Sequence, residues 1–160
     1  MQPAPQDATL DRDRIWFLDT LVHVRVSAQD GADGMSVLEQ LVPQGSSPPL
    51  HVHHDEDEIF HLLEGEIRIK LGQHVRKVTV GQTLLAPRGV PHTFCVDSRT
   101  AHMLIVTCNG SFERFVRTVG RPAESEMLPV LDGPPTPEQM QALTEVAQSC
   151  HITFVGPPLS

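Results

Sequence analysis

Apolar and polar residues alternate over much of residues 15–107, with the period of two that half-buried β-strands show. In residues 15–26 the polar side chains Asp19, His23 and Arg25 share one parity, which predicts a single strand with one buried face. The apolar positions of that predicted strand are Trp16, Leu18, Val22, Val24 and Val26. Further short strands separated by turns are predicted at 36–42, 50–54, 58–63, 66–71, 75–80, 83–86, 93–96 and 103–107, and the alternation is strict at 66–71. Many short strands at close spacing indicate an all-β sandwich or small barrel.

The C-terminal third changes from this alternation to a helical pattern. The spacing of Phe112 and Phe115 predicts a short helix over residues 111–119. A second helix is predicted over residues 138–148, with Thr136 in position to cap its first turn. The chain is therefore expected to place short helices outside an all-β core.

A chain of 160 residues is expected to form one domain, and we divide it into three parts. Residues 1–13 are polar and contain prolines, which predicts a flexible N-terminal arm. Residues 14–120 are expected to form the barrel. Residues 121–160 contain a Pro-rich connector, the second helix and a final strand at 152–155; they are too few for a separate core and are expected to pack on the barrel.

Charge and composition exclude several classes of partner. The chain has 12 Lys and Arg against 20 Asp and Glu, a net charge of -8, whereas nucleic acids and anionic membranes select basic surfaces. No stretch approaches the roughly 20 apolar residues of a membrane span, and the first residues lack the apolar core of a secretory signal. The three cysteines are odd in number and widely spaced, which favours reduced thiols and a cytoplasmic location.

Nine histidines occur in the chain, and three of them belong to a regular pattern with one glutamate. His51 and His53 lie two apart on a predicted strand, so both side chains project to one face. Glu58 follows an acidic turn, and His92 follows a turn built on two prolines. Three imidazoles and one carboxylate from three strands could meet inside a barrel, and this donor set suits a divalent transition metal. The set leaves open whether that metal is Fe, Mn, Co, Ni, Cu or Zn.

Two spaced motifs carry a resemblance to a known family. The first reads Gly45-x5-His51-x-His53-x4-Glu58-x6-Gly65, and the second reads Gly81-x5-Pro87-x-Gly89-x2-His92. The chain is thereby identified as a member of the cupin superfamily. It is similar in particular to single-domain cupins that resemble bacterial quercetin 2,3-dioxygenases, through HVHHDEDEIFHLLEGEIRI, LLAPRGVPHTF, SFERFVRTVGRPA and ITFVGPP. Val96 stands where an Asn is usual, which leaves the metal ligands unaffected.

The resemblance implies a fold and a reaction. The fold is the double-stranded β-helix, a jelly-roll barrel. The reaction is the cleavage of a flavonol or related enolic aromatic by dioxygen with loss of carbon monoxide, with Glu58 as both ligand and general base and one divalent metal per chain. The same residues would also serve a non-oxygenase cupin, which is an isomerase, lyase or cyclase. A small-molecule-binding cupin without turnover is the third alternative.

Three further expectations concern the surroundings of these residues. Strand parity turns His54 and His61 away from the proposed ligands. The acidic turn Asp55–Asp57 is expected to be solvated, with contact between one of its carboxylates and a ligand His as the alternative. The exposed edges of an antiparallel barrel favour a homodimer. The expected cavity wall, for which core packing is an equal alternative, consists of Phe60, Leu62, Phe94, Val96, Leu104 and Val106.

Overall fold

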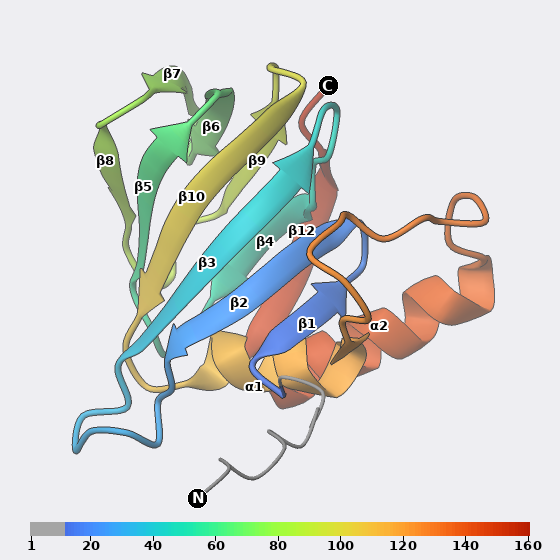
Figure 1. Cartoon of the computed structure of the whole chain (residues 1–160). Coiled ribbons are helices and arrows are strands. Elements are labelled where there is room, and N and C mark those ends of the chain that lie inside the picture. Colours follow the sequence, from blue (N-terminus) through green and yellow to red (C-terminus); the bar gives the residue numbers. More distant parts are fainter. Residues whose placement is uncertain (1–11) are drawn as a thin grey trace, which may run out of the picture.

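The structure is a computed structural model, and it describes residues 12–160. Most of the predicted N-terminal arm, residues 1–13, lies outside the described residues. The strands and helices follow one another along the chain as shown in Figure 1. Their bounds are β1 Arg14–Phe17, β2 Thr20–Val26, β3 Ser36–Pro43, β4 Pro49–His53, β5 Glu58–Glu64, β6 Glu66–Leu71, β7 His74–Thr79, β8 Thr83–Ala86, β9 His92–Val96, β10 Thr100–Thr107, α1 Ser111–Val119, β11 Arg121–Pro122, α2 Pro137–Ser149 and β12 Ile152–Pro158.

The strands form two antiparallel sheets. The larger sheet has the order β11-β1-β2-β3-β10-β5-β8, and the smaller has the order β12-β4-β9-β6-β7. Consecutive strands β4 and β5 lie in different sheets, as do β9 and β10, so the chain crosses repeatedly from one sheet to the other. This arrangement confirms the predicted double-stranded β-helix.

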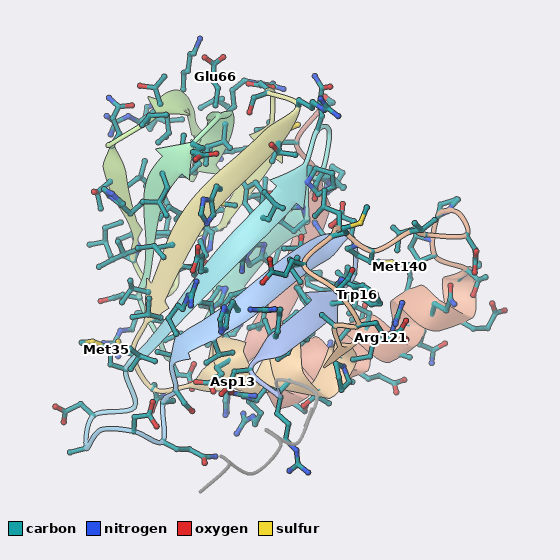
Figure 2. The ribbon with its side chains drawn as sticks, in the orientation of Figure 1. Asp13, Trp16, Met35, Glu66, Arg121 and Met140 are labelled. Atoms are coloured by element: carbon teal, nitrogen blue, oxygen red, sulfur yellow. The ribbon has the colours of Figure 1, made fainter. Side chains whose placement is uncertain are left out.

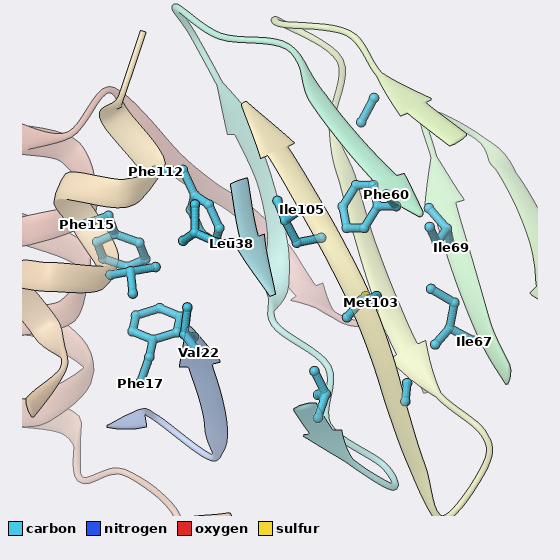
Figure 3. Close-up of a cluster of buried hydrophobic side chains, with 14 of the residues drawn as sticks. Phe17, Val22, Leu38, Phe60, Ile67, Ile69, Met103, Ile105, Phe112 and Phe115 are labelled. Atoms are coloured by element: carbon cyan, nitrogen blue, oxygen red, sulfur yellow. The ribbon is translucent and has the colours of Figure 1, made fainter. Parts of the chain in front are cut away.

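The hydrophobic core lies between the two sheets and extends to the side chains of helix α1 (Figure 3). Met103 and Ile105 of β10 face Ile67 and Ile69 of β6, and all four side chains are almost fully buried. The inward side chains alternate with partly exposed ones along each of these strands, as an antiparallel sheet with one wet face requires. Burial of apolar area between the sheets is the main source of stability for such a fold.

Helix α1 closes one end of the barrel. It packs against β1 and against α2, and α2 packs in turn against β12. Phe115 of α1 contacts Phe17 of β1 in a T-shaped arrangement, with ring centroids 5.4 Å apart. Helix α1 has the bounds that its apolar spacing predicted. No helix within residues 12–160 is long and apolar enough to cross a membrane.

The single strand predicted for residues 15–26 is wrong, because the chain turns at Leu18. Leu18 has a φ of 54°, and Phe17 pairs with Thr20 across this tight turn between β1 and β2. The turn reverses the parity, so Phe17 is buried while Trp16 faces outward. There the indole N–H of Trp16 donates to the Met127 carbonyl. The guanidinium carbon of Arg121 lies 4.4 Å from the centroid of the Trp16 ring system (Figure 2).

The C-terminal strand is a full member of the smaller sheet. Helix α2 begins with the predicted cap, since the Thr136 hydroxyl accepts from the Gln139 backbone N–H and the Gln139 side chain bonds back to Thr136. Strand β12 then pairs with β4, with Ile152 opposite His53 and Phe154 opposite His51. It therefore supports the strand that presents the first two histidines of the motif. The strand continues to Pro158, beyond the predicted end at residue 155.

Gly65 forms the tight connection between β5 and β6. Its φ is +89°, and a Cβ at this position would lie 2.3 Å from the Thr100 carbonyl oxygen. Only glycine accepts both this conformation and this close approach. The last glycine of the first motif therefore has a steric role in the barrel.

Candidate metal centre

Three of the motif residues lie on neighbouring strands of the smaller sheet. His51 and His53 are two apart on β4, so they share the inward face. His92 opens β9 and lies directly opposite His51 in the antiparallel register. The ring centroids of His51 and His92 are 4.5 Å apart, and that of His53 lies 5.2 Å and 5.3 Å from them respectively. The three imidazoles therefore form one compact group.

Glu58 reaches this group from the opposite sheet. It opens β5, and its Oε2 lies 2.8 Å from Nε2 of His92 and 3.4 Å from Nε2 of His53. One donor atom from each of the four residues lies within 4.8 Å of the other three. His53 and His92 are each 1% exposed, Glu58 is 3% exposed and His51 is 9% exposed. The group thus lies buried between the two sheets, and His51 is its most solvent-exposed member.

Backbone carbonyls fix the orientation of two of the imidazoles. Nδ1 of His51 lies 2.8 Å from the Pro49 carbonyl oxygen, and Nδ1 of His92 lies 3.0 Å from the Val90 carbonyl oxygen. A carbonyl oxygen can only accept a hydrogen bond, so each Nδ1 carries the hydrogen. In the neutral rings Nε2 then presents a lone pair toward the centre of the group.

His53 is held by a carboxylate in place of a carbonyl. Its Nδ1 lies 3.0 Å from Oε1 of Glu56. Its Nε2 is buried and has no hydrogen-bond partner, although it faces the same centre as the other two. A buried nitrogen without a partner is rare in folded proteins, because its desolvation is uncompensated.

These contacts test whether the four residues fit a metal ion. If Nε2 of His92 carries a lone pair, it faces the lone pairs of Glu58 at 2.8 Å, and the two atoms repel unless a cation or a proton lies between them. Metal-bound nitrogen and oxygen atoms lie about 2.0–2.2 Å from the ion, which sets donor atoms roughly 3–4 Å apart. The 3.4 Å between Oε2 of Glu58 and Nε2 of His53 lies in this range, and the 2.8 Å between Oε2 and Nε2 of His92 lies just below it. The Nε2 of His53, which has no hydrogen-bond partner among residues 12–160, would gain a partner. The group therefore fits a divalent transition metal.

The electrostatics of the group also favour a cation. Burial, followed by the neighbouring His92, lowers the pKa of His51 to about 4. Burial alone would raise the pKa of Glu58, but the imidazoles of His53 and His92 outweigh it and lower that pKa to about 2. Burial would lower the pKa of His53, but the carboxylates of Glu58 and Glu56 outweigh it and raise that pKa above the ordinary value. The centre therefore holds an ionised carboxylate at neutral pH.

The two remaining histidines of the motif region point away, as parity predicted. His54 is exposed and bonds through Nε2 to the Thr153 hydroxyl at 2.9 Å. His61 lies on the outer face of β5, where its Nδ1 contacts the Thr83 hydroxyl at 2.8 Å. Neither ring belongs to the group of four.

The residues expected to form a cavity wall fall into two sets. Phe60, Leu62 and Val96 are buried in the core, and Phe94 packs against it. Phe60 also lies beside the centre, with its ring centroid 6.1 Å from that of His92. The expectation for Leu104 and Val106 is wrong: the burial pattern of β10 turns them to the opposite face. The inward positions of that strand are Ala101, Met103, Ile105 and Thr107.

The prediction of a solvated acidic turn is wrong for Glu56. This side chain is fully buried, and its Oε1 accepts from the Phe112 backbone N–H at 2.7 Å as well as contacting His53. Asp55 accepts from the Ser111 hydroxyl at 2.8 Å. The sequence did contain a sign that Glu56 is buried, because Glu56 shares the parity that places Glu58 and Phe60 inward. The turn is thus attached to the start of α1.

Comparison with known sequences finds relatives of this chain among the cupins. The family model of the cupin domain matches residues 37–107. Quercetin 2,3-dioxygenase of Bacillus subtilis is 32% identical over 118 residues, which cover 73% of this chain and 35% of that protein. An uncharacterized protein of Methanocaldococcus jannaschii is 37% identical over 57 residues, which cover 36% of this chain and 46% of that protein. The chain therefore aligns with less than half the length of each of these curated relatives.

Comparison with solved structures supports the fold. KdgF from Halomonas sp. has a TM-score of 0.52 at 14% identity, covering 56% of this chain and 78% of the other. The cupin domain of Schizosaccharomyces pombe Cnp3 has a TM-score of 0.52 at 12% identity, covering 64% of this chain and 74% of the other. At identities this low, the likeness supports the shared barrel fold and carries no inference about function.

Proposed function

The chain belongs to the cupin superfamily and resembles quercetin 2,3-dioxygenase, and from this premise we propose that it is a metal-dependent dioxygenase. The proposed reaction is the ring cleavage of a flavonol or related enolic aromatic by dioxygen, in the cytoplasm. The observation that carries the proposal is the convergence of three imidazoles and one ionised carboxylate on a single buried point. The likeness to a curated quercetinase supports the choice of an oxygenase reaction.

His51, His53, Glu58 and His92 are proposed to hold one divalent transition metal per chain. The three Nε2 atoms supply the nitrogen ligands, and the carbonyl and carboxylate partners of Nδ1 keep the rings in place. The donor set fits Fe, Mn, Co, Ni, Cu or Zn. When bound, such a metal would supply Lewis acidity toward an oxygen of the substrate.

Glu58 is proposed to act as the general base. Its carboxylate is buried, and its low pKa keeps it ionised at neutral pH. Oε2 stands beside the Nε2 atoms of His92 and His53, so it is next to any substrate oxygen that enters the centre. The carboxylate would accept the proton of the substrate hydroxyl and hold it at Oε2 while the electron-rich ring reacts with dioxygen.

Aromatic side chains are proposed to keep water from the reacting atoms. The ring of Phe112 lies against His53, with centroids 5.7 Å apart, and Phe60 lies beside His92 on the other side. Phe94 packs on Phe60, with centroids 6.1 Å apart. Apolar walls of this kind strengthen the electrostatic contacts inside the site.

Oxygen uptake by metal-loaded protein with a panel of flavonols tests the reaction. We expect consumption of dioxygen and release of carbon monoxide with at least one member of the panel. Turnover of a substrate without oxygen uptake would contradict the dioxygenase and favour an isomerase, lyase or cyclase. Binding of a flavonol without turnover would instead favour a binding cupin.

A homodimer is proposed from the sheet edges. Strands β7 and β12 end the smaller sheet, and β8 ends the larger one, so each leaves one side unpaired among the described strands. Pairing between two copies would cover such edges. Light scattering should give twice the 17.6 kDa of one chain, and the mass of a single chain would contradict the proposal.

A further inference from the structure

Glu56 is a buried carboxylate that the proposed reaction does not use. Its side chain is 0% exposed, yet no Lys or Arg side chain within residues 12–160 forms a hydrogen bond or salt bridge with it. Oε1 accepts from the Phe112 backbone N–H at 2.7 Å and lies 3.0 Å from Nδ1 of His53, while Oε2 is buried without a hydrogen-bond partner. Burial of a carboxylate with so few partners costs free energy that its hydrogen bonds offset only in part.

The start of helix α1 fixes the position of Glu56. The N-cap residue Gly110 offers no side chain, and Glu56 of the acidic turn supplies an acceptor for the Phe112 backbone N–H in the first turn of the helix. Asp55 accepts from the side-chain hydroxyl of Ser111. A negative charge is favoured at this end of a helix because the free N–H groups carry partial positive charge. The helix therefore holds the carboxylate against His53.

His53 differs from the other two imidazoles in the group that its Nδ1 atom contacts. The Nδ1 atoms of His51 and His92 donate to neutral backbone carbonyls, whereas that of His53 faces a carboxylate. A carboxylate behind an imidazole fixes the tautomer and makes the distal nitrogen a stronger electron donor. The atom so strengthened is Nε2 of His53, which has no hydrogen-bond partner and faces Glu58.

We propose that Glu56 is a positioning residue for metal binding: it holds the hydrogen of His53 on Nδ1 and so directs a lone pair on Nε2 to the metal centre. The inference rests on the metal-binding part of the proposed function and is independent of the reaction. Phe112 completes the arrangement, because its backbone N–H fixes Glu56 while its ring packs on His53. Helix α1 is thereby part of the support of the metal centre.

The isosteric pair Glu56→Gln and Asp55→Asn separates this role from the attachment of the acidic turn to helix α1. Both residues belong to the same turn and bond to the start of α1, but only Glu56 contacts His53. The dissociation constant of Co²⁺, measured by competition with a chelator, should rise about 10- to 100-fold in Glu56→Gln. In Asp55→Asn it should stay within about threefold of wild type. Thermal unfolding of the metal-free variants checks that both are folded.

Imidazole ¹⁵N chemical shifts give a readout that does not need the metal. In the metal-free wild-type protein above pH 8, His53 should carry its hydrogen on Nδ1. In Glu56→Gln the carboxamide can also donate to Nδ1, so a substantial population with the hydrogen on Nε2 should appear. Because the wild-type spectrum alone tests the tautomer, a failure of Glu56→Gln to fold would leave that test intact.

Three results would overturn the inference about Glu56. They are Co²⁺ affinity in Glu56→Gln equal to wild type, an equal loss of affinity in Asp55→Asn, and a wild-type His53 protonated on Nε2. Absence of Co²⁺ binding by the wild-type protein would instead refute the proposed function itself. The two failures are therefore distinguishable.

Discussion

Nε2 of His92 and Oε2 of Glu58 lie 2.8 Å apart, although the two residues belong to opposite sheets of the barrel. The Val90 carbonyl holds the hydrogen of His92 on Nδ1, so two electron-rich atoms face one another in the centre. Glu58 has a low pKa and is ionised at neutral pH, so its carboxyl group supplies no proton to this contact. A bound cation resolves this contact, and we regard the contact as the strongest structural argument for a metal.

Glu58→Gln should separate the ligand role of this residue from its role as a base. The carboxamide keeps the shape and one oxygen donor but cannot usefully accept the substrate proton. On protein matched for metal content by elemental analysis, we expect kcat to fall about 10²- to 10⁴-fold. Glu64→Gln, at the exposed end of the same strand, is the control and should keep wild-type turnover. A metal-replete Glu58→Gln enzyme within about threefold of wild type would remove the base assignment.

Metal affinity should weaken in mild acid through His53. The carboxylates of Glu58 and Glu56 raise the pKa of His53 in the metal-free protein, so a proton competes with the metal from above the ordinary His pKa of about 6.5. His51, whose pKa is about 4, should remain available over the same range and add to the loss only below pH 5. Co²⁺ titrations between pH 8 and pH 5 measure this, and an affinity independent of pH over that range would disagree with the proposed ligand set.

Gly65→Ala should destabilise the metal-free barrel more than Gly72→Ala does. Both glycines have positive φ, but a Cβ at position 65 meets the Thr100 carbonyl oxygen at 2.3 Å, while a Cβ at position 72 meets nothing within 4 Å. The left-handed backbone alone costs an alanine about 1–2 kcal/mol of unfolding free energy, and the contact adds to it. Urea unfolding of the two variants measures the difference. Equal stability would show that the backbone relaxes at the β5–β6 turn.

The sequence predicted the bounds of some short elements well, including β6, in which polar and apolar residues alternate strictly. The bounds predicted for β6 and β8, 66–71 and 83–86, are those of the structure, and so are those of α1. Strand β10 shows the limit of this approach. Met103, Leu104, Ile105 and Val106 are all apolar, so the pattern gives no sign of which parity faces inward. Pairing with β3 and β5 decides it, and that pairing is a property of the whole sheet.

The turn at Leu18 and Asp19 was missed because Asp19 also fits the alternation as a polar strand position, and Leu18 is not a usual turn residue. Tight two-residue turns with positive φ usually use Gly, Asn or Asp, and a leucine at 54° is unfavourable by itself. The pairing of β1 with both β2 and β11, together with the packing of Phe17 on α1, compensates for this strain. Two of these partners, β11 and α1, lie about one hundred positions away along the chain.

The convergence of His51, His53, Glu58 and His92 could be predicted because their spacing follows from strand geometry, whereas Glu56 could not be assigned its partners. Its contact with Phe112 joins residues 56 positions apart through a helix that packs on the barrel. Parity indicated that Glu56 could face inward, but three consecutive acidic residues also resemble an ordinary exposed turn. The position of α1 distinguishes the two, and only the folded chain provides it.

The central claim, one metal ion bound by this group, is tested most directly by metal stoichiometry. Elemental analysis of protein saturated with Co²⁺ and then desalted should give one ion per wild-type chain and none in the double variant His51→Ala/His92→Ala. The control His54→Ala/His61→Ala removes two imidazoles that point away from the centre and should keep one ion per chain. One ion per chain in His51→Ala/His92→Ala would contradict the account.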